Sequence, residues 1–361
     1  MDFNFKGLTL NSIYYSLEDL VDFCLFELIS KDLPAWQKEI YGFIVEFISP
    51  TEFITQPTSG TTGGVKYIEI TKKEMIGSAK LTTQFFGLSP DKNALHCLPM
   101  KYIAGKMMVV RAFVSGMNLI LTQPLGKPDI SSHGTIDFCA MVPLQVSNFL
   151  ENQENLDPIK TLIVGGSEID STLQKKLEDI PTEVYETFGM TETCSHIALR
   201  KVNGIDSTNY FVALKRVRLR KDKRGCLVIK APFLTRKIVT NDMVELVRRN
   251  QFKWLGRYDN IINSGGIKIH PETLEQEIEK IIHKEVVVTS EPDNLLGQKV
   301  VLVVETGEAE INETQILKVL KQGLPKHLVP KKIIVTTKFP RNNALKIDRK
   351  KLITILNLKK T

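Results

Sequence analysis

The sequence has few cysteines and histidines, and they are not spaced as metal ligands. Only 5 of the 361 residues are Cys and 6 are His, and no two cysteines lie close enough in sequence to form a CxxC pair. This excludes the common zinc motifs. A scattered, odd-numbered set of thiols is typical of a reducing compartment rather than of a disulfide-rich fold. We therefore expect a cytoplasmic protein with free cysteines.

The sequence also lacks a long uninterrupted apolar run. Its most apolar stretch, residues 107–121, contains Arg111 and Gly116, whereas a membrane helix needs about 20 apolar residues. Asp2 follows the first methionine directly, without the basic and apolar segments of a signal peptide. The net charge of +7 suits anionic ligands, but basic and aromatic residues do not alternate in a stripe. We expect no membrane span and no nucleic-acid partner.

From Lys66 to about Arg200, short β-rich runs alternate with helical segments. The predicted strands are 94–98, 118–122, 135–141, 161–164 and 183–187, and the predicted helices are 74–86, 144–151 and 171–179. Such alternation is typical of βαβ units around a largely parallel sheet. The run at 161–164 is apolar throughout, as expected for a strand that is buried on both faces. The pattern predicts an α/β fold.

After Arg200 the pattern changes twice. Runs at 225–230, 237–240, 244–248 and 252–255 predict a β-rich meander. A third section begins near Asn260, where Pro271 predicts the first turn of a helix and Asn312 predicts the start of another, with strands at 286–289 and 299–305 between them. We predict a large N-terminal domain, residues 1–256, with mostly parallel sheets and a β-rich subdomain, and a small α+β domain, residues 257–361.

The segment from residue 58 to residue 66 predicts an anion-binding loop. Its glycines allow close approach of the backbone to a ligand, and its hydroxyl groups and lysine are donors for phosphate oxygens. It is not a Walker A loop, because Val65 and Tyr67 stand where that motif needs Gly and Ser or Thr. Taken alone, the segment would fit a turn between two strands equally well. Its residues are Thr58, Ser59, Gly60, Thr61, Thr62, Gly63, Gly64, Val65 and Lys66.

Five further segments carry polar residues at positions suited to ligand binding. A glycine pair directly follows the apolar strand 161–164, and ligands of open α/β sheets bind at the carboxyl ends of strands. The segments are Val164–Glu168, Tyr185–Thr193, Val239–Asp242, Gly256–Glu272 and Pro340–Arg349.

In order and approximate spacing, these six segments resemble the motifs of the adenylate-forming superfamily, which contains acyl-CoA synthetases, luciferases and the adenylation domains of peptide synthetases. The resemblance extends from Thr58 to Arg349. It implies activation of a carboxylic acid with ATP and Mg²⁺ to an acyl-adenylate, followed by transfer to coenzyme A. Within the superfamily, residues 97–106 are most similar to the branch that forms o-succinylbenzoyl-CoA in menaquinone biosynthesis. The section before Thr58 is shorter than is usual in the superfamily.

The resemblance also implies roles for individual residues. Those that would hold the phosphates are Thr58, Ser59, Gly60, Thr61, Thr62, Gly63 and Lys66. Gly165, Gly166 and Ser167 would flank the adenine or the acyl pocket. Tyr185 would lie near the adenine, and Asp242 and Arg257 would bind the ribose. In catalysis, Thr191 would contact the α-phosphate, Glu192 would bind Mg²⁺, and Lys346 would reach the α-phosphate and the substrate carboxylate. Gly266 would leave space for the pantetheine arm, and Asp259 would be the hinge of a mobile C-terminal lid.

The acyl pocket is less closely defined by sequence. If the acid carries a second carboxylate, that group needs a cation or several donors. The candidates are Lys101, Tyr102, Lys106, Arg111, Ser195 and His196. Lys101 and Lys106 fit a solvated surface role equally well.

Two residues depart from the superfamily pattern, and several functions stay open. Asn241 replaces the glycine of a Thr-Gly-Asp motif, and Leu345 replaces the glycine before the predicted catalytic lysine. Asn tolerates the left-handed backbone that glycine adopts, so we expect function to survive. The alternatives are an aryl- or fatty-acyl-CoA ligase, transfer to the phosphopantetheine of a carrier protein, and a non-enzymatic protein that binds AMP or acyl-AMP. A homodimer is also left open.

Overall fold

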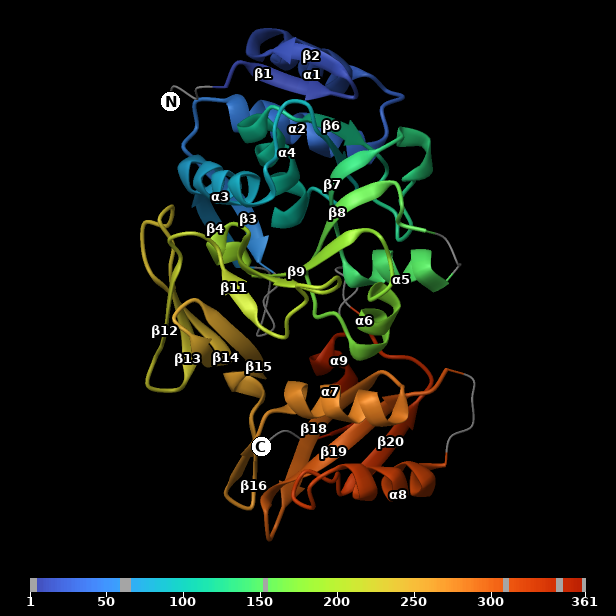
Figure 1. Ribbon diagram of the computed structural model, residues 1–361. Helices are drawn as coiled ribbons and strands as arrows, with labels where there is room; N and C mark the ends of the chain where they lie inside the picture. The colour runs from blue at the N-terminus through green and yellow to red at the C-terminus, as the bar shows by residue number, and fades with distance from the viewer. Residues whose placement is uncertain (1–4, 59–65, 152–154, 308–311, 342–346, 359–361) are drawn as a thin grey trace.

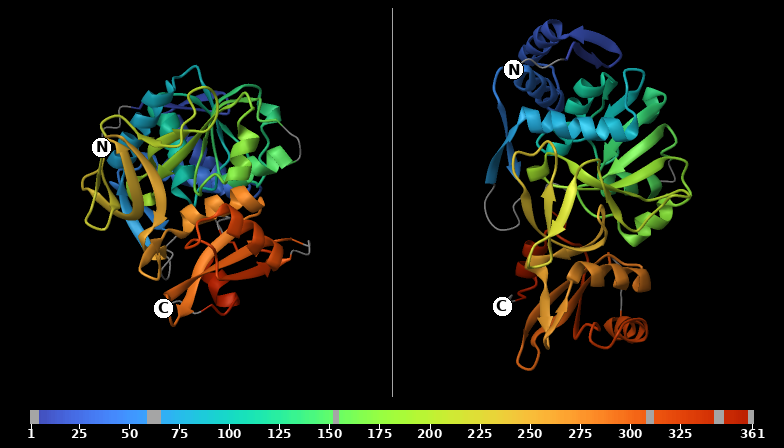
Figure 2. Two further views of the ribbon diagram at one scale, coloured as in Figure 1. Left: turned by 60° about the horizontal axis from the view of Figure 1, so that its bottom comes forward. Right: turned by 60° about the vertical axis from the view of Figure 1, so that its left-hand side comes forward.

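The computed structural model describes residues 5–58, 66–151, 155–307, 312–341 and 347–358. A large lobe and a small lobe each contain their own sheet, and the N-terminal elements lie at the end of the large lobe that is remote from the small lobe (Figures 1 and 2). The chain leaves the first sheet at Arg257 and enters the second at Ile262. The division into domains at residue 256 stays a prediction.

The large lobe is built on one sheet of thirteen strands. Neighbouring strands are parallel from β9 to β1 and antiparallel at both ends of the sheet. The spatial order is β12 (Arg218–Lys221), β13 (Cys226–Lys230), β14 (Ile238–Arg248), β15 (Gln251–Arg257), β11 (Phe211–Ala213), β10 (His196–Lys201), β9 (Glu183–Gly189), β8 (Ile159–Val164), β7 (Ile136–Met141), β5 (Asn93–His96), β6 (Asn118–Leu121), β1 (Gly7–Leu10) and β2 (Ile13–Ser16). The predicted parallel sheet and meander are therefore both present, as parts of one sheet.

One predicted pair of strands is wrong in detail. Except for residue 237, the runs 237–240 and 244–248 belong to the single strand β14, because Asp242 and Met243 between them continue the ladder with β15. The register shifts between Met243 and Val244, which marks a β-bulge. A bulge lets a strand continue through an irregular position that sequence alone would take for a turn.

Helices cover the large sheet, and a hairpin stands beside it (Figure 1). The helices are α1 (Leu17–Ile29), α2 (Ala35–Ile48), α3 (Lys72–Phe86), α4 (Ile103–Ser115), α5 (Pro143–Glu151) and α6 (Ser171–Leu177), and the hairpin strands are β3 (Phe53–Thr58) and β4 (Lys66–Thr71). The predictions for α3, α5 and α6 are close to the observed bounds. Helix α4 went unpredicted, because residues buried in an unbroken run from Met107 to Phe113 leave no amphipathic period to detect.

The small lobe has a five-stranded sheet covered by helices. Its strands are β16 (Ile262–Ser264), β17 (Ile267–Ile269), β18 (Val286–Asp293), β19 (Gly297–Glu305) and β20 (Lys332–Thr336), and its helices are α7 (Pro271–Ile282), α8 (Glu313–Gly323) and α9 (Arg349–Ile355). Pro271 occupies the first turn of α7, as predicted. Asn312 caps α8 by accepting a hydrogen bond from the Thr314 N–H.

The two lobes meet where α7 packs against α6 and β15. Across this contact, the Gln276 amide donates a hydrogen bond to the Glu168 carboxylate. Thr273 of α7 donates a second one to the Leu255 carbonyl, at 2.9 Å. Among the described residues, no helix is long and apolar enough to cross a membrane.

The buried side chain of Lys72 ties α3 to the end of α2. Its ammonium donates to the carbonyls of Glu46 and Ser49, both at 2.7 Å, and to the Thr51 hydroxyl at 3.0 Å. These carbonyls belong to the last turn of α2 and the residue after it, where backbone acceptors lack helical partners.

Lys72→Met should lower the free energy of unfolding by about 3 kcal/mol, because several buried acceptors would lose their donor. Lys73→Met is the matched control, since Lys73 is exposed on the same turn. Urea denaturation of both variants measures the difference, and equal stability of the two would contradict this role of Lys72.

Candidate active site

The glycine turn after β8 lies at the carboxyl end of the parallel strands. Val164, the last residue of β8, pairs with Glu186 of β9. A Cβ on Gly165 would overlap the Thr187 hydroxyl, and Gly166 has φ of 94°. Both positions therefore need glycine, and the turn brings backbone groups to an edge of the sheet where ligands bind.

The next strand delivers Thr191 and Glu192 to the same edge. They lie in the short 3₁₀ turn η2 (Thr191–Thr193), directly after β9. The Thr193 hydroxyl fastens this turn by donating to the Ser195 carbonyl at 2.7 Å. Glu192 is exposed and Thr191 is half-buried. The turn thus presents a carboxylate and a hydroxyl beside the glycine turn.

The donor set at Glu192 fits a Mg²⁺ ion that is shared with a ligand. Within the described part of the chain, no group of three or more His, Cys, Asp or Glu residues could hold a metal ion. The exposed Glu192 carboxylate suits Mg²⁺, whose usual environment in nucleotide sites is one or two carboxylates with phosphate oxygens and water.

Tyr185 lies further back on β9, in an aromatic cluster with α3. Its ring meets the rings of Phe85 and Phe86 edge-on, with centroids 5.9 and 5.1 Å apart. The Lys201 ammonium lies 5.7 Å from the centroid of the same ring. The position of Tyr185 beside the adenine stays a prediction.

Asp242 and Arg257 are brought together by the pairing of β14 with β15. They are direct partners in the ladder, and their side chains form an ion pair at 3.8 Å. The Asp242 carboxylate, whose residue is 7% exposed, also accepts a hydrogen bond from the Trp254 indole at 3.1 Å. Desolvation raises the pKa of Asp242, and the charge of Arg257 opposes that shift. A buried, oriented carboxylate of this kind is suited to accept hydrogen bonds from ribose hydroxyls.

The predicted hinge lies directly after this pair. Asp259 is in the turn η3 (Tyr258–Asn260), and Arg257 contacts its carboxylate at 3.2 Å. Gly266 lies in the turn between β16 and β17 with φ of 82°, and a Cβ there would meet nothing within 4 Å. Gly266 is therefore open to an incoming ligand, and its backbone conformation accounts for the glycine.

The candidates for the acyl pocket fall into two groups. Lys101 and Lys106 line a cavity of about 290 Å³ between α2 and α4, together with Glu39, Phe43, Glu46 and Met100. Burial lowers the pKa of Lys106, whose ammonium lies 5.7 Å from the centroid of the Phe43 ring. Tyr102 is the residue before the first turn of α4.

Ser195 belongs to the second group, which is centred on Arg111. Arg111 is 2% exposed, and its guanidinium donates a hydrogen bond to the Ser195 hydroxyl at 2.5 Å. His196 contacts the Ser195 hydroxyl at 3.3 Å and the Thr82 hydroxyl at 3.2 Å. Burial and the charge of Arg111 hold the pKa of His196 well below its usual range, so this histidine is neutral.

The Arg111 guanidinium has no anionic partner among the described residues. Burial alone, with no neighbouring carboxylate, accounts for the lowered pKa of Arg111, and its Nε atom has no hydrogen-bond partner among the described residues. An uncompensated buried charge is costly. Arg111 reaches the half-buried Ser195, so an anionic ligand group at Ser195 would supply the missing countercharge.

Several predicted residues lie outside what the structure describes. These are Ser59, Gly60, Thr61, Thr62, Gly63 and Lys346. The backbones of Thr58 and Lys66 pair with each other at the end of the β3–β4 hairpin.

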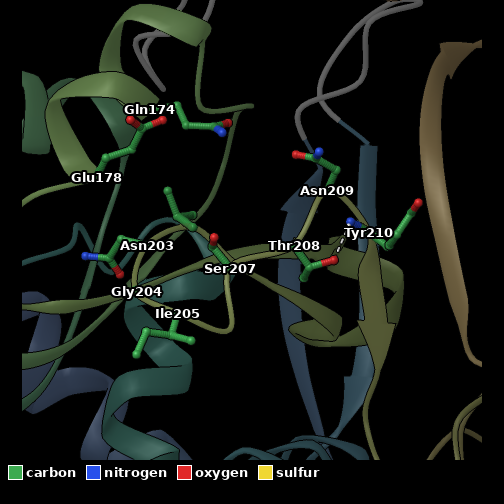
Figure 3. A pocket seen from close by; sticks show the side chains of 10 residues that line it. Gln174, Glu178, Asn203, Gly204, Ile205, Ser207, Thr208, Asn209 and Tyr210 are labelled. Atoms are coloured by element: carbon green, nitrogen blue, oxygen red, sulfur yellow. Dashed lines mark hydrogen bonds between the residues drawn. The ribbon is translucent and has the colours of Figure 1, made fainter.

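A further cavity lies apart from all the predicted residues. It has a volume of about 700 Å³ and is lined by Gln174 of α6, by Glu178 directly after that helix, and by residues of the 202–210 segment (Figure 3). None of the predicted site residues lines it. It is therefore not part of the candidate site.

Comparison with known proteins adds independent support. A family model described as AMP-binding enzyme matches residues 48–234. Curated relatives from strains of Staphylococcus aureus, named 2-succinylbenzoate–CoA ligase, are 27% identical over 327 residues, which is 82% of this chain and 65% of theirs. The chain thus spans just under two thirds of the length of these relatives.

Solved structures show the same fold. An acyl-CoA synthetase (AMP-forming)/AMP-acid ligase II-like protein from Dyadobacter fermentans is 32% identical, with a TM-score of 0.61 over 93% of this chain and 98% of that one. The o-succinylbenzoate CoA synthetase of Bacillus subtilis, solved with its acyl-adenylate intermediate, has a TM-score of 0.78 at 17% identity, over 96% of this chain and 95% of that one. These similarities confirm the predicted fold class.

Proposed function

Because the chain belongs to the AMP-binding enzyme family, we propose that it activates a carboxylic acid with ATP and transfers the acyl group to coenzyme A. One observation carries this proposal. The neighbouring parallel strands β8 and β9 deliver the glycine turn at Gly165 and the turn at Glu192 to the same edge of the sheet. That edge is where nucleotides bind in α/β folds.

Different residues of the candidate site would contribute to different parts of the adenylation step. Thr191 would contact the α-phosphate while the substrate carboxylate attacks it and pyrophosphate leaves. Negative charge grows on the phosphoryl oxygens, so fixed donors and cations supply most of the rate. Mg²⁺ at Glu192 would neutralise part of that charge, and Lys346 would supply another positive charge. The thiol of coenzyme A then displaces AMP, so that no protein nucleophile is needed.

The acid that we propose is o-succinylbenzoate. It has two carboxylates, of which one is activated, and the other would give Arg111 its missing anionic partner through Ser195. The names of the curated relatives agree with this substrate. Fatty or simple aryl acids, the alternative substrates, would leave the Arg111 charge unpaired. The five free, buried cysteines suit a cytoplasmic enzyme with ATP, the acid and coenzyme A as its small-molecule partners.

The test is pyrophosphate exchange across a panel of carboxylic acids. We expect exchange with o-succinylbenzoate, followed by release of AMP and formation of the thioester when coenzyme A is added. Exchange with other acids alone would redirect the substrate assignment. A carrier-protein thiol in place of coenzyme A separates the two acceptors, and ATP binding without any exchange would favour a non-enzymatic protein.

Asp242→Asn should raise the KM for ATP about tenfold to thirtyfold, because the ribose hydroxyls would lose a charged acceptor. The KM for the acid should change little. Glu245→Gln is the matched control, since Glu245 is an exposed carboxylate on the same strand. Steady-state kinetics with ATP as the varied substrate measures the effect, and an unchanged KM would remove Asp242 from the nucleotide site.

A further inference from the structure

The carboxylate of the predicted hinge residue is held by the large sheet. The Asn241 amide donates to both Asp259 oxygens, at 3.1 and 3.3 Å. Asn241 lies on β14, and Asp259 lies in η3, where the chain leaves the sheet. Asn241 is also the residue that departs from the superfamily pattern, which has glycine there. A glycine could not make these two bonds.

Arg224 fixes the orientation of the Asn241 side-chain amide. Arg224 donates to the Asn241 side-chain oxygen at 2.8 Å and to the Thr240 carbonyl at 3.0 Å. The guanidinium of Arg224 also lies 5.2 Å from the centroid of the Tyr258 ring, next to the hinge residue. Because the amide oxygen faces Arg224, the amide nitrogen must face Asp259.

Asn260, the residue after Asp259, is bonded to the small lobe. Asn260 donates a hydrogen bond to the Glu272 carboxylate of α7 at 2.5 Å. The chain is therefore fixed to the large lobe at Asp259 and to the small lobe one residue later. If one lobe rotated relative to the other about this point, the hydrogen bonds of Asp259 would be the first contacts to change.

We propose that Asn241 is a positioning residue that latches the hinge through Asp259 and favours the lobe arrangement seen here. This inference rests on the proposed function and on the hinge role of Asp259 that the resemblance to the superfamily implies. The Asp259 side chain is 48% exposed, so solvent competes with the latch. Loss of two exposed hydrogen bonds should shift the ratio of lobe arrangements about fivefold.

The test measures the distance between the lobes directly. All five native cysteines are buried, so spin labels can be placed selectively after Lys80→Cys in α3 and Lys321→Cys in α8, both at exposed positions. In the full chain, Asn241→Gly and Asn241→Ala should each shift the distance distribution away from the arrangement seen here, by about fivefold in population. An unchanged distribution in both variants overturns the latch.

Two further variants separate the latch from a general loss of structure. Asn241→Asp would place two carboxylates side by side and should shift the distribution at least as far as glycine does. Combining it with Asp259→Asn exchanges the two groups and should restore the distribution to within about twofold. Failure of the exchange to restore it counts against the latch.

The control and the activity assay keep the two proposals apart. Asn250→Gly, in the exposed β14–β15 turn, should leave the distribution unchanged. If it shifts the distribution as Asn241→Gly does, the latch is refuted. Absence of pyrophosphate exchange in the unsubstituted chain would refute the proposed function, while the distance shift would still report on the latch.

Discussion

Lys346→Ala should lower the rate of adenylation about a thousandfold, because a positive charge at the developing phosphoryl negative charge would be lost. Thioester formation from supplied acyl-adenylate should change less than about threefold, since that step expels AMP and gains little from the same cation. Lys346 lies outside the described residues, so this expectation comes from the motif 340–349.

Two assays on the same preparation decide the role of Lys346. Pyrophosphate exchange reports adenylation, and single-turnover thioester formation reports the second step. Lys350→Ala is the control, because Lys350 is an exposed residue of α9 close by in sequence. Equal losses in the two steps would remove Lys346 from its assigned role.

Arg111→Met should lower the activity toward one class of acid and at the same time raise the stability of the ligand-free protein. We expect kcat/KM for an acid with a second carboxylate to fall about a hundredfold to a thousandfold, because that carboxylate would lose a buried cation. A monocarboxylic analogue should lose less than about threefold. The ligand-free protein should become more stable, because an apolar side chain of similar length replaces a buried charge without an anionic partner.

Because kcat/KM should fall while stability rises, the two measurements together test the role of Arg111. A variant that merely misfolds loses activity toward all acids and also loses stability. Arg220→Met, on the exposed face of β12, is the control for loss of a surface charge. If the dicarboxylic and monocarboxylic acids lose activity equally, Arg111 does not select the second carboxylate.

Much of the fold could be predicted because its periodicities are local. The β-rich runs that form β7, β8 and β9, and the amphipathic face of α7, can each be recognised within a dozen residues. The N-terminal helices α1 and α2 went unpredicted. Helix α1 is apolar over much of its circumference, with Phe26 and Ile29 exposed. Its sequence therefore does not show which face of the helix is buried.

In the candidate site, too, local motifs could be recognised from sequence, whereas long-range contacts could not. Asp242 and Arg257 could be named from motifs, and the ladder of β14 and β15 then places them together. The contact of Arg111 with Ser195 joins residues 84 apart in sequence. The contact of Arg224 with Asn241 likewise depends on how β13 pairs with β14. Such contacts follow from strand order and register, which no local pattern specifies.

The continuous backbone ladder from β8 to β15 has a consequence for how substrate range could change. The groups predicted to bind the ribose and the α-phosphate lie on or directly after strands of this one sheet, so a change at one of them should also disturb the other. Helix α4, which carries Arg111, lies outside that ladder and contacts the large sheet through side-chain packing and through the hydrogen bonds of Arg111 with Ser195 and of His96 with the Gly105 carbonyl. Exchange of α4 between relatives should therefore alter the preferred acid while the affinity for ATP stays the same.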